Sequence, residues 1–113
     1  MAGIMCAMVG SGGGSVSVSI SPGDQSASGS TATHVFSAQT VTVTGGTPSS
    51  YTWSFNSQTG GTWSIASGQS TATAVPQVGS VSSGADDFAN FNCAVVVNGN
   101  TYNVFANLEY QRF

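Results

Sequence analysis

Residues 87–110 read DFANFNCAVVVNGNTYNVFANLEY, in which two runs of alternating apolar residues flank the dipeptide Asn98-Gly99. This dipeptide tolerates the two positive φ angles of a type I′ hairpin turn. A two-residue loop would pair Val97 with Asn100 and fix the register of every later pair. Since side chains alternate between the two faces of a strand, one set of residues is predicted to share the buried face: Ala89, Phe91, Cys93, Val95, Tyr102, Val104, Ala106 and Leu108.

The rest of the chain repeats this pattern of short strands and turns. Alternating runs at residues 16–21, 35–44, 51–55, 62–66 and 71–75 are separated by clusters of Gly, Pro, Ser and Asn, which are turn residues. Residues 24–33 are interpreted as a polar loop and residues 78–86 as a loose connection. About seven strands at this spacing predict an all-β antiparallel sandwich. The sandwich is expected to span residues 16–113, after a flexible apolar and Gly-rich tail and linker at residues 1–15.

The composition limits the partners of the protein. The chain of 113 residues suits one domain, and only 4% of the residues are charged. Its single cation, Arg112, cannot form the basic patch that nucleic acids or anionic membranes attract. Residues 1–9 are too short to span a bilayer and lack both a basic start and a cleavage site. We therefore expect no nucleic-acid binding, no membrane insertion and no secretion signal.

The residues that carry chemistry are few and scattered. His34 is the only histidine, and both cysteines lie far from it, so neither a zinc site nor a nucleophilic triad is predicted. Asp86 and Asp87 are adjacent on a strand and would point to opposite faces, which rules them out as an acid/base pair. Asp87 is expected to hydrogen-bond nearby backbone and Asp24 to stabilise a turn, an interpretation favoured over a calcium cluster of these three carboxylates. We expect no enzymatic activity, no metal and no cofactor.

The remaining candidates are cysteines and aromatic residues. Cys93 is interpreted as a small apolar core residue, and a disulfide with Cys6 is the less favoured alternative. Trp53, Phe91 and Tyr102 are expected in the core. Trp63 follows a Gly-Gly pair near the expected sandwich edge. Plain packing is favoured for Trp63, with a sugar-stacking platform or a subunit contact as alternatives.

A family resemblance is carried by Asp87, Ala89, Phe91 and Cys93, with Trp53 upstream. The run of residues 87–93 resembles the D-x-A-x-Y-x-C signature of immunoglobulin-like domains, and Trp53 is similar to their strand C tryptophan. Phe91 replaces the tyrosine, and residues 39–43 contain no cysteine. The chain therefore resembles the disulfide-free immunoglobulin-like domains of bacterial surface proteins and of tailed-phage virions, and the resemblance covers residues 16–113.

This resemblance leads to the first functional hypothesis, a non-enzymatic structural protein of a tailed-phage virion. A place in the tail or its tip is favoured, with capsid decoration as the alternative. The chain carries no secretion signal, is small and starts at Met1, and has a nearly uncharged Ser/Thr/Asn surface, all of which suit a protein released by lysis. Its partners would be copies of itself and other virion proteins, with weak adhesion to host glycans as an added role.

The expected partner contacts lie at the two ends of the chain. The apolar tail can be a disordered start or a peptide that docks on a neighbouring subunit through Ile4, Met5, Met8 and Val9. At the other end, Arg112 and Phe113 can form an interface contact or a fraying tail.

The second hypothesis is a carbohydrate-binding or adhesion module on a bacterial surface. It would use Trp63, Tyr51 or Tyr110 as stacking platforms for sugar rings.

Overall fold

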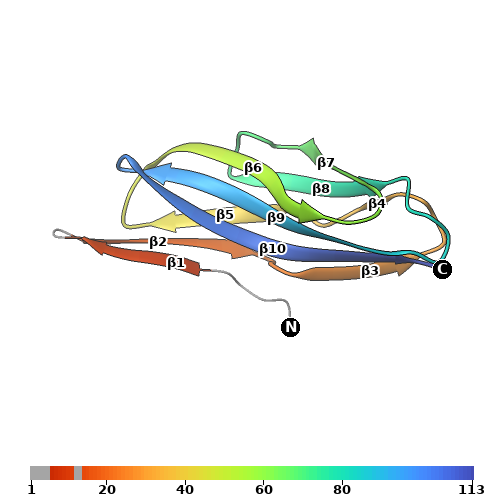
Figure 1. Ribbon diagram of the computed structural model, residues 1–113. Helices are drawn as coiled ribbons and strands as arrows, with labels where there is room; N and C mark the ends of the chain where they lie inside the picture. The colour runs from red at the N-terminus through yellow and green to blue at the C-terminus, as the bar shows by residue number, and fades with distance from the viewer. Residues whose placement is uncertain (1–5, 12–13) are drawn as a thin grey trace.

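The computed structural model describes residues 6–11 and 14–113, and it is an all-β sandwich of two sheets (Figure 1). The predicted fold class is confirmed. The described residues measure 53 × 25 × 19 Å along the principal axes, so the sandwich is elongated along its strands. The described residues contain ten strands, whereas the sequence predicts about seven: β1 (Cys6–Ser11), β2 (Gly14–Ser21), β3 (Gln25–Gly29), β4 (His34–Val35), β5 (Gln39–Thr44), β6 (Pro48–Gln58), β7 (Thr62–Ser67), β8 (Thr73–Gly79), β9 (Asp86–Val97) and β10 (Asn100–Arg112).

The strand order follows a known architecture. One sheet runs β1-β2-β5-β8-β4, with β7 also paired to β8, and the other runs β3-β10-β9-β6. The run β2-β5-β8-β7 facing β10-β9-β6 corresponds to the A-B-E-D and G-F-C sheets of immunoglobulin sandwiches. Apolar side chains from both sheets fill the space between them.

The C-terminal hairpin forms in the predicted register. Asn98 and Gly99 have φ angles of 54° and 78°, as a type I′ turn requires. Val97 pairs with Asn100, and every later pair follows, as far as Gln111 with Asp86. All the residues expected on the buried face are at most 5% exposed. Local turn chemistry therefore fixed the longest pairing in the molecule.

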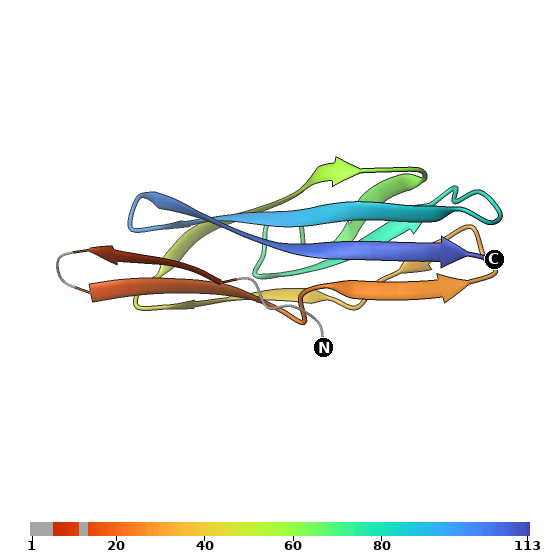
Figure 2. The same cartoon turned by 60° about the horizontal axis from the view of Figure 1, so that its bottom comes forward.

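The predicted polar loop at residues 24–33 is wrong in its first half. Residues 25–29 form β3, which lies parallel to the C-terminal part of β10 (Figure 2). The chain crosses from one sheet to the other at Gly23, whose backbone N–H and C=O both bond the buried side-chain amide of Gln39, at 3.0 and 2.7 Å. The next residue, Asp24, accepts a hydrogen bond from the backbone N–H of Asn107 at 2.8 Å. The pairing of β3 with β10 joins segments about eighty residues apart, so no local sequence pattern indicates it.

Two further predictions, for residues 6–11 and 35–44, are corrected by the structure. Residues 6–11, expected in a flexible tail, form β1 and pair with β2 from Cys6–Ser19 to Ser11–Gly14. Composition did not indicate this strand because an open sheet edge pairs backbone groups whatever the side chains are. The strand predicted at residues 35–44 is divided into β4 and β5. Met8 and Val9 lie in β1, whereas Ile4 and Met5 lie outside the described residues.

The core centres on Trp53, as predicted. Its indole is 1% exposed, stacks on Phe91 with ring centroids 4.8 Å apart and donates from Nε1 to the carbonyl of Thr71 at 2.7 Å. Tyr102 and Cys93 are buried as well. Cys93 is a free thiol, and burial raises its pKa to about 12. The prediction of a buried thiol is therefore confirmed, and the disulfide with Cys6 does not form.

Candidate binding face

One broad surface of the sandwich is the outer side of the four-stranded sheet. Every second residue of β6, β9, β10 and β3 points away from the core, because side chains alternate along a strand. Polar residues without charge dominate this surface, which carries no Lys, Arg or His. We call the following set the outer face: Ser50, Thr52, Ser54, Asn56, Asp86, Phe88, Asn90, Asn92, Ala94, Val96, Thr101, Asn103, Phe105, Asn107, Glu109, Gln111, Ser26 and Ser28.

Asparagine amides tie the strands of the outer face together. Asn56 donates to Asn90 at 3.0 Å, and Asn90 donates to Asn107 at 2.9 Å, so one line of amides crosses β6, β9 and β10. A second link joins Asn92 to Asn103 at 3.3 Å. Cross-strand pairs of this kind stabilise a sheet and hold its side chains in place. The outer face is therefore an ordered array of hydrogen-bonding groups.

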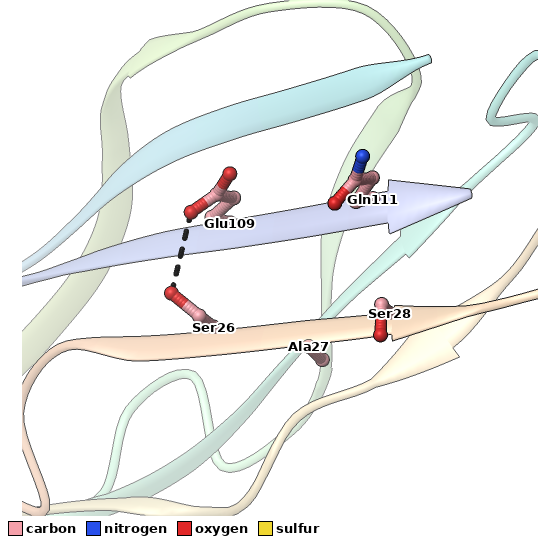
Figure 3. A pocket seen from close by; sticks show the side chains of 5 residues that line it. All are labelled: Ser26, Ala27, Ser28, Glu109 and Gln111. Atoms are coloured by element: carbon pink, nitrogen blue, oxygen red, sulfur yellow. Dashed lines mark hydrogen bonds between the residues drawn. The ribbon is translucent and has the colours of Figure 1, made fainter. Parts of the chain in front are cut away.

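A hollow of about 290 Å³ lies at one end of the outer face, over β3 and β10 (Figure 3). Its polar lining comes from Ser26 and Ser28 on β3 and from Glu109 and Gln111 on β10. Figure 3 shows the Glu109 and Gln111 side chains rising from β10 beside the two serines. The Ser26 hydroxyl donates to Glu109 Oε1 at 3.3 Å. Two adjacent strands thus present hydroxyl, amide and carboxylate groups around one depression.

Negative charge is concentrated at the same end. Asp86 on β9 lies opposite Gln111, so it is the diagonal neighbour of Glu109 on the outer face. A hydrogen bond with Asp86, together with loss of hydration and charge repulsion, raises the pKa of Glu109, and the Ser26 hydroxyl opposes this. The two carboxyl groups therefore lie close together beside the hollow, where their remaining oxygen atoms can accept hydrogen bonds.

Two exposed aromatic side chains lie near residues that line the hollow, one on β9 and one just beyond β10. Phe88 is 47% exposed and lies directly opposite Glu109 in the β9–β10 ladder. Phe113 is 72% exposed, and its backbone N–H bonds the carbonyl of Gly29 at 2.9 Å, beyond the end of β10. Arg112 points inward, so alternation places Phe113 on the same side as Gln111. Among the described residues, the one other large apolar side chain classed as exposed is Val35, on β4 of the other sheet.

The predicted sugar-stacking platforms are mostly unavailable. Trp63 is 5% exposed, and its Nε1 donates to the carbonyl of Thr59 at 3.1 Å. Tyr110 is 1% exposed, and its hydroxyl donates to the carbonyl of Thr31 at 2.8 Å. The platform hypothesis is therefore wrong for both, because both side chains point into the core, where plain packing holds Trp63. Tyr51 lies half-buried on β6.

The two predicted contact residues at the C-terminus differ in their surroundings: Arg112 bonds within the molecule, and Phe113 is exposed. Arg112 donates from Nη1 to the carbonyl of Val81 at 2.8 Å, and its backbone N–H bonds Ala85 at 2.9 Å. The fraying alternative is therefore wrong, and the only cation of the chain is engaged inside the molecule. Phe113 stays exposed and remains a candidate contact residue.

Asp87 and His34 make contacts within the fold. Asp87 is buried and accepts a hydrogen bond from the backbone of Gly61 at 2.7 Å, so its predicted backbone role is confirmed. No group of three or more His, Cys, Asp or Glu side chains in the described residues is arranged to hold a metal ion. His34 stacks on Tyr110 at 4.9 Å, and partial burial lowers its pKa.

Sequence reasoning missed the hollow because its residues come from distant segments. Ser26 and Ser28 belong to the unpredicted strand β3, and only the parallel pairing with β10 brings them to Glu109. Phe88 was the one readable signal, since alternation from Asp87 places it on the outer face.

No family model, no curated protein and no solved structure matches this chain. The described residues contain no helix long and apolar enough to cross a membrane. The architecture and the outer face define the class, an all-β sandwich of two sheets with a nearly uncharged outer sheet face.

Proposed function

We propose that the protein is a non-enzymatic structural component of a tailed-phage virion, located in the tail or its tip. It acts by binding other virion proteins and copies of itself. The observation that carries the proposal is the outer face, which is flat, exposed and nearly free of charge. Contacts through such a face depend little on ionic strength, because salt screens charges and not neutral hydrogen bonds.

The hydrogen-bonding pattern supports a binding role. The asparagines of the outer face bond one another, and Asp87 and Gln39 bond backbone groups. In the described residues every buried side-chain nitrogen or oxygen has a partner. Polar groups committed in this way make a rigid module whose surface is preorganised for docking.

The place of the module in the particle remains part of the proposal. Capsid decoration is the alternative within a virion, and display on a bacterial cell surface is the alternative outside it. The proposed tether to a neighbouring subunit is retained for Ile4 and Met5. Met8 and Val9 belong to a strand of the sandwich, so their role in that tether would require β1 itself to take part.

Incorporation into particles tests the proposal. The tagged chain is expressed during phage growth, particles are purified on a density gradient, and gold-labelled antibodies locate the tag. The variant Asn103→Arg places a charge on the outer face, and Thr42→Arg on the exposed side of β5 is the matched control. We expect label at the tail for the wild type and the control, and a several-fold loss for Asn103→Arg. Recovery of the wild-type chain in the cell-envelope fraction, with none in particles, would overturn the proposal.

A further inference from the structure

We propose that the hollow at the end of the outer face, together with the nearby Phe88 and Phe113, binds an uncharged oligosaccharide. This deepens the adhesive part of the proposed function by naming its site and ligand class. The site does not depend on a virion, so saccharide binding and particle incorporation can fail independently.

The spacing of the two aromatic rings suits a short saccharide. Phe88 lies opposite Glu109, and Phe113 follows four residues further along the chain. At about 3.3 Å per residue, the two ends of this site are roughly 13 Å apart along β10. The hollow lies over the same stretch of β10, on the side that faces β3 rather than β9. Two or three sugar rings laid along β10 would contact both phenyl groups and cover the hollow.

The chemistry of the lining matches the two kinds of surface on a sugar ring. Exposed phenyl faces pack against the apolar C–H surface of a ring. Around them, Glu109 and Asp86 supply acceptors, Gln111 both donates and accepts, and Ser28 adds a hydroxyl. Hydroxyl groups at the rim of a ring need such a mixture of donors and acceptors. The sheet holds these groups in fixed positions, so little order has to be created on binding.

The charge distribution selects a ligand without negative charge. Glu109 lines the hollow and Asp86 is its diagonal neighbour, so two carboxyl groups are close together at this end of the outer face. The guanidinium of Arg112 bonds the carbonyl of Val81 and is directed away from the outer face. A phosphate, sulfate or carboxylate on the ligand would therefore meet repulsion with no compensating cation.

The position of the exposed apolar side chains separates this end from the rest of the molecule. Single exposed apolar residues are ordinary on protein surfaces, whereas a group of them marks an interaction site. Phe88 and Phe113 both lie at the end of the outer face that carries the polar hollow, while the middle of the outer face presents mainly Asn, Ser and Thr. On the other sheet, a second hollow of similar volume is lined by a single exposed apolar side chain, Val35. Sequence reasoning placed a sugar platform at Trp63 and Tyr110, and both of those rings are buried.

The experiment is an NMR titration of the ¹⁵N-labelled chain with maltotriose, cellotriose and chitotriose, followed by an array that carries neutral, sialylated and sulfated glycans. We expect at least one neutral glycan to bind and to shift the amide signals of residues 26–29, 88 and 109–113. Phe88→Ser and Phe113→Ser should each weaken binding about two- to tenfold, the value of one aromatic contact. Val35→Ser, which removes an exposed apolar side chain from the other sheet, is the matched control and should leave binding unchanged.

Four results would overturn the proposal. The first is that no neutral glycan binds on the array or in the titration. The second is binding that shifts amides away from the hollow. The third is binding that both phenylalanine variants retain in full, since their dispersed spectra would show that they remain folded. Preferential binding of sialylated or sulfated glycans would also refute the charge argument.

Discussion

Removal of the Gln39 side chain is expected to be among the most destabilising single changes in the chain. Gln39 is 0% exposed and bonds both backbone groups of Gly23 where the chain crosses between sheets. Gln39→Ala deletes two hydrogen bonds and leaves two buried backbone groups without partners, which costs about 2–5 kcal/mol. Since a domain of this kind is stable by only about 5–15 kcal/mol, the loss is a large fraction.

The chain contains its own control for this prediction. Gln25 makes the same pair of amide-to-backbone bonds with Ser37, both at 3.1 Å, but at an exposed position. In Gln25→Ala water replaces the lost partners, so we expect a loss below about 1 kcal/mol. Urea unfolding followed by tryptophan fluorescence should lower the midpoint of Gln39→Ala by roughly 1–3 M, with the slope unchanged. Equal destabilisation of the two variants would refute the view that burial makes the Gln39 bonds matter.

Three further predictions concern stability and reactivity. Gly99→Ala should lower the free energy of unfolding by about 1 kcal/mol, because the φ angle of 78° strains an alanine although the space around it is open. Gly45→Ala should lower it more, because the added Cβ would collide with the carbonyl of Ser15. Thermal unfolding of both variants compares them. Burial raises the pKa of Cys93 to about 12, so iodoacetamide at pH 8 should label this thiol in urea but not in the folded protein, as peptide mass spectrometry would show. Partial burial lowers the pKa of His34 below its ordinary value of 6.5, so its contribution to stability is full above pH 6.5 and is lost as pH falls through the folded pKa. The melting temperature of the wild type should then fall more steeply with acid than that of His34→Gln, and parallel curves would contradict the assignment.

Short-range chemistry explains what could be predicted. The Asn98-Gly99 turn and the alternation on both sides of it gave the register of β9 and β10, the buried face and the position of Trp53 in the core. Asp87 was correctly assigned to backbone hydrogen bonding. The hairpin register and the buried face depend on residues within a few positions of one another and on period-two alternation, whereas the backbone partner of Asp87 is Gly61, a residue distant in the sequence.

The errors share a different cause. Packing was the favoured interpretation for Trp63 and is confirmed, whereas the surface platform offered as its alternative, and for Tyr110, is wrong because both side chains are buried. Burial of a residue near a sheet edge depends on which segment packs over it, and the Thr31 and Thr59 carbonyls that accept from these rings come from separate loops. The Gln39 contact with Gly23 was missed for the same reason, since a glutamine in an alternating strand gives no sign of a buried partner.

The sequence by itself determined an all-β chain, its C-terminal hairpin and its scarcity of charge. Turn residues, alternation and composition can all be read without knowing which distant segments are in contact. Only the tertiary structure decided that β3 crosses to lie beside β10, which brings Ser26 and Ser28 to Glu109 and creates the hollow over these two strands. A strand pairs through backbone groups that every residue carries, so its own side chains do not specify a distant partner strand. The packing of the whole sandwich selects that partner, and the sequence of either segment gives little indication of it.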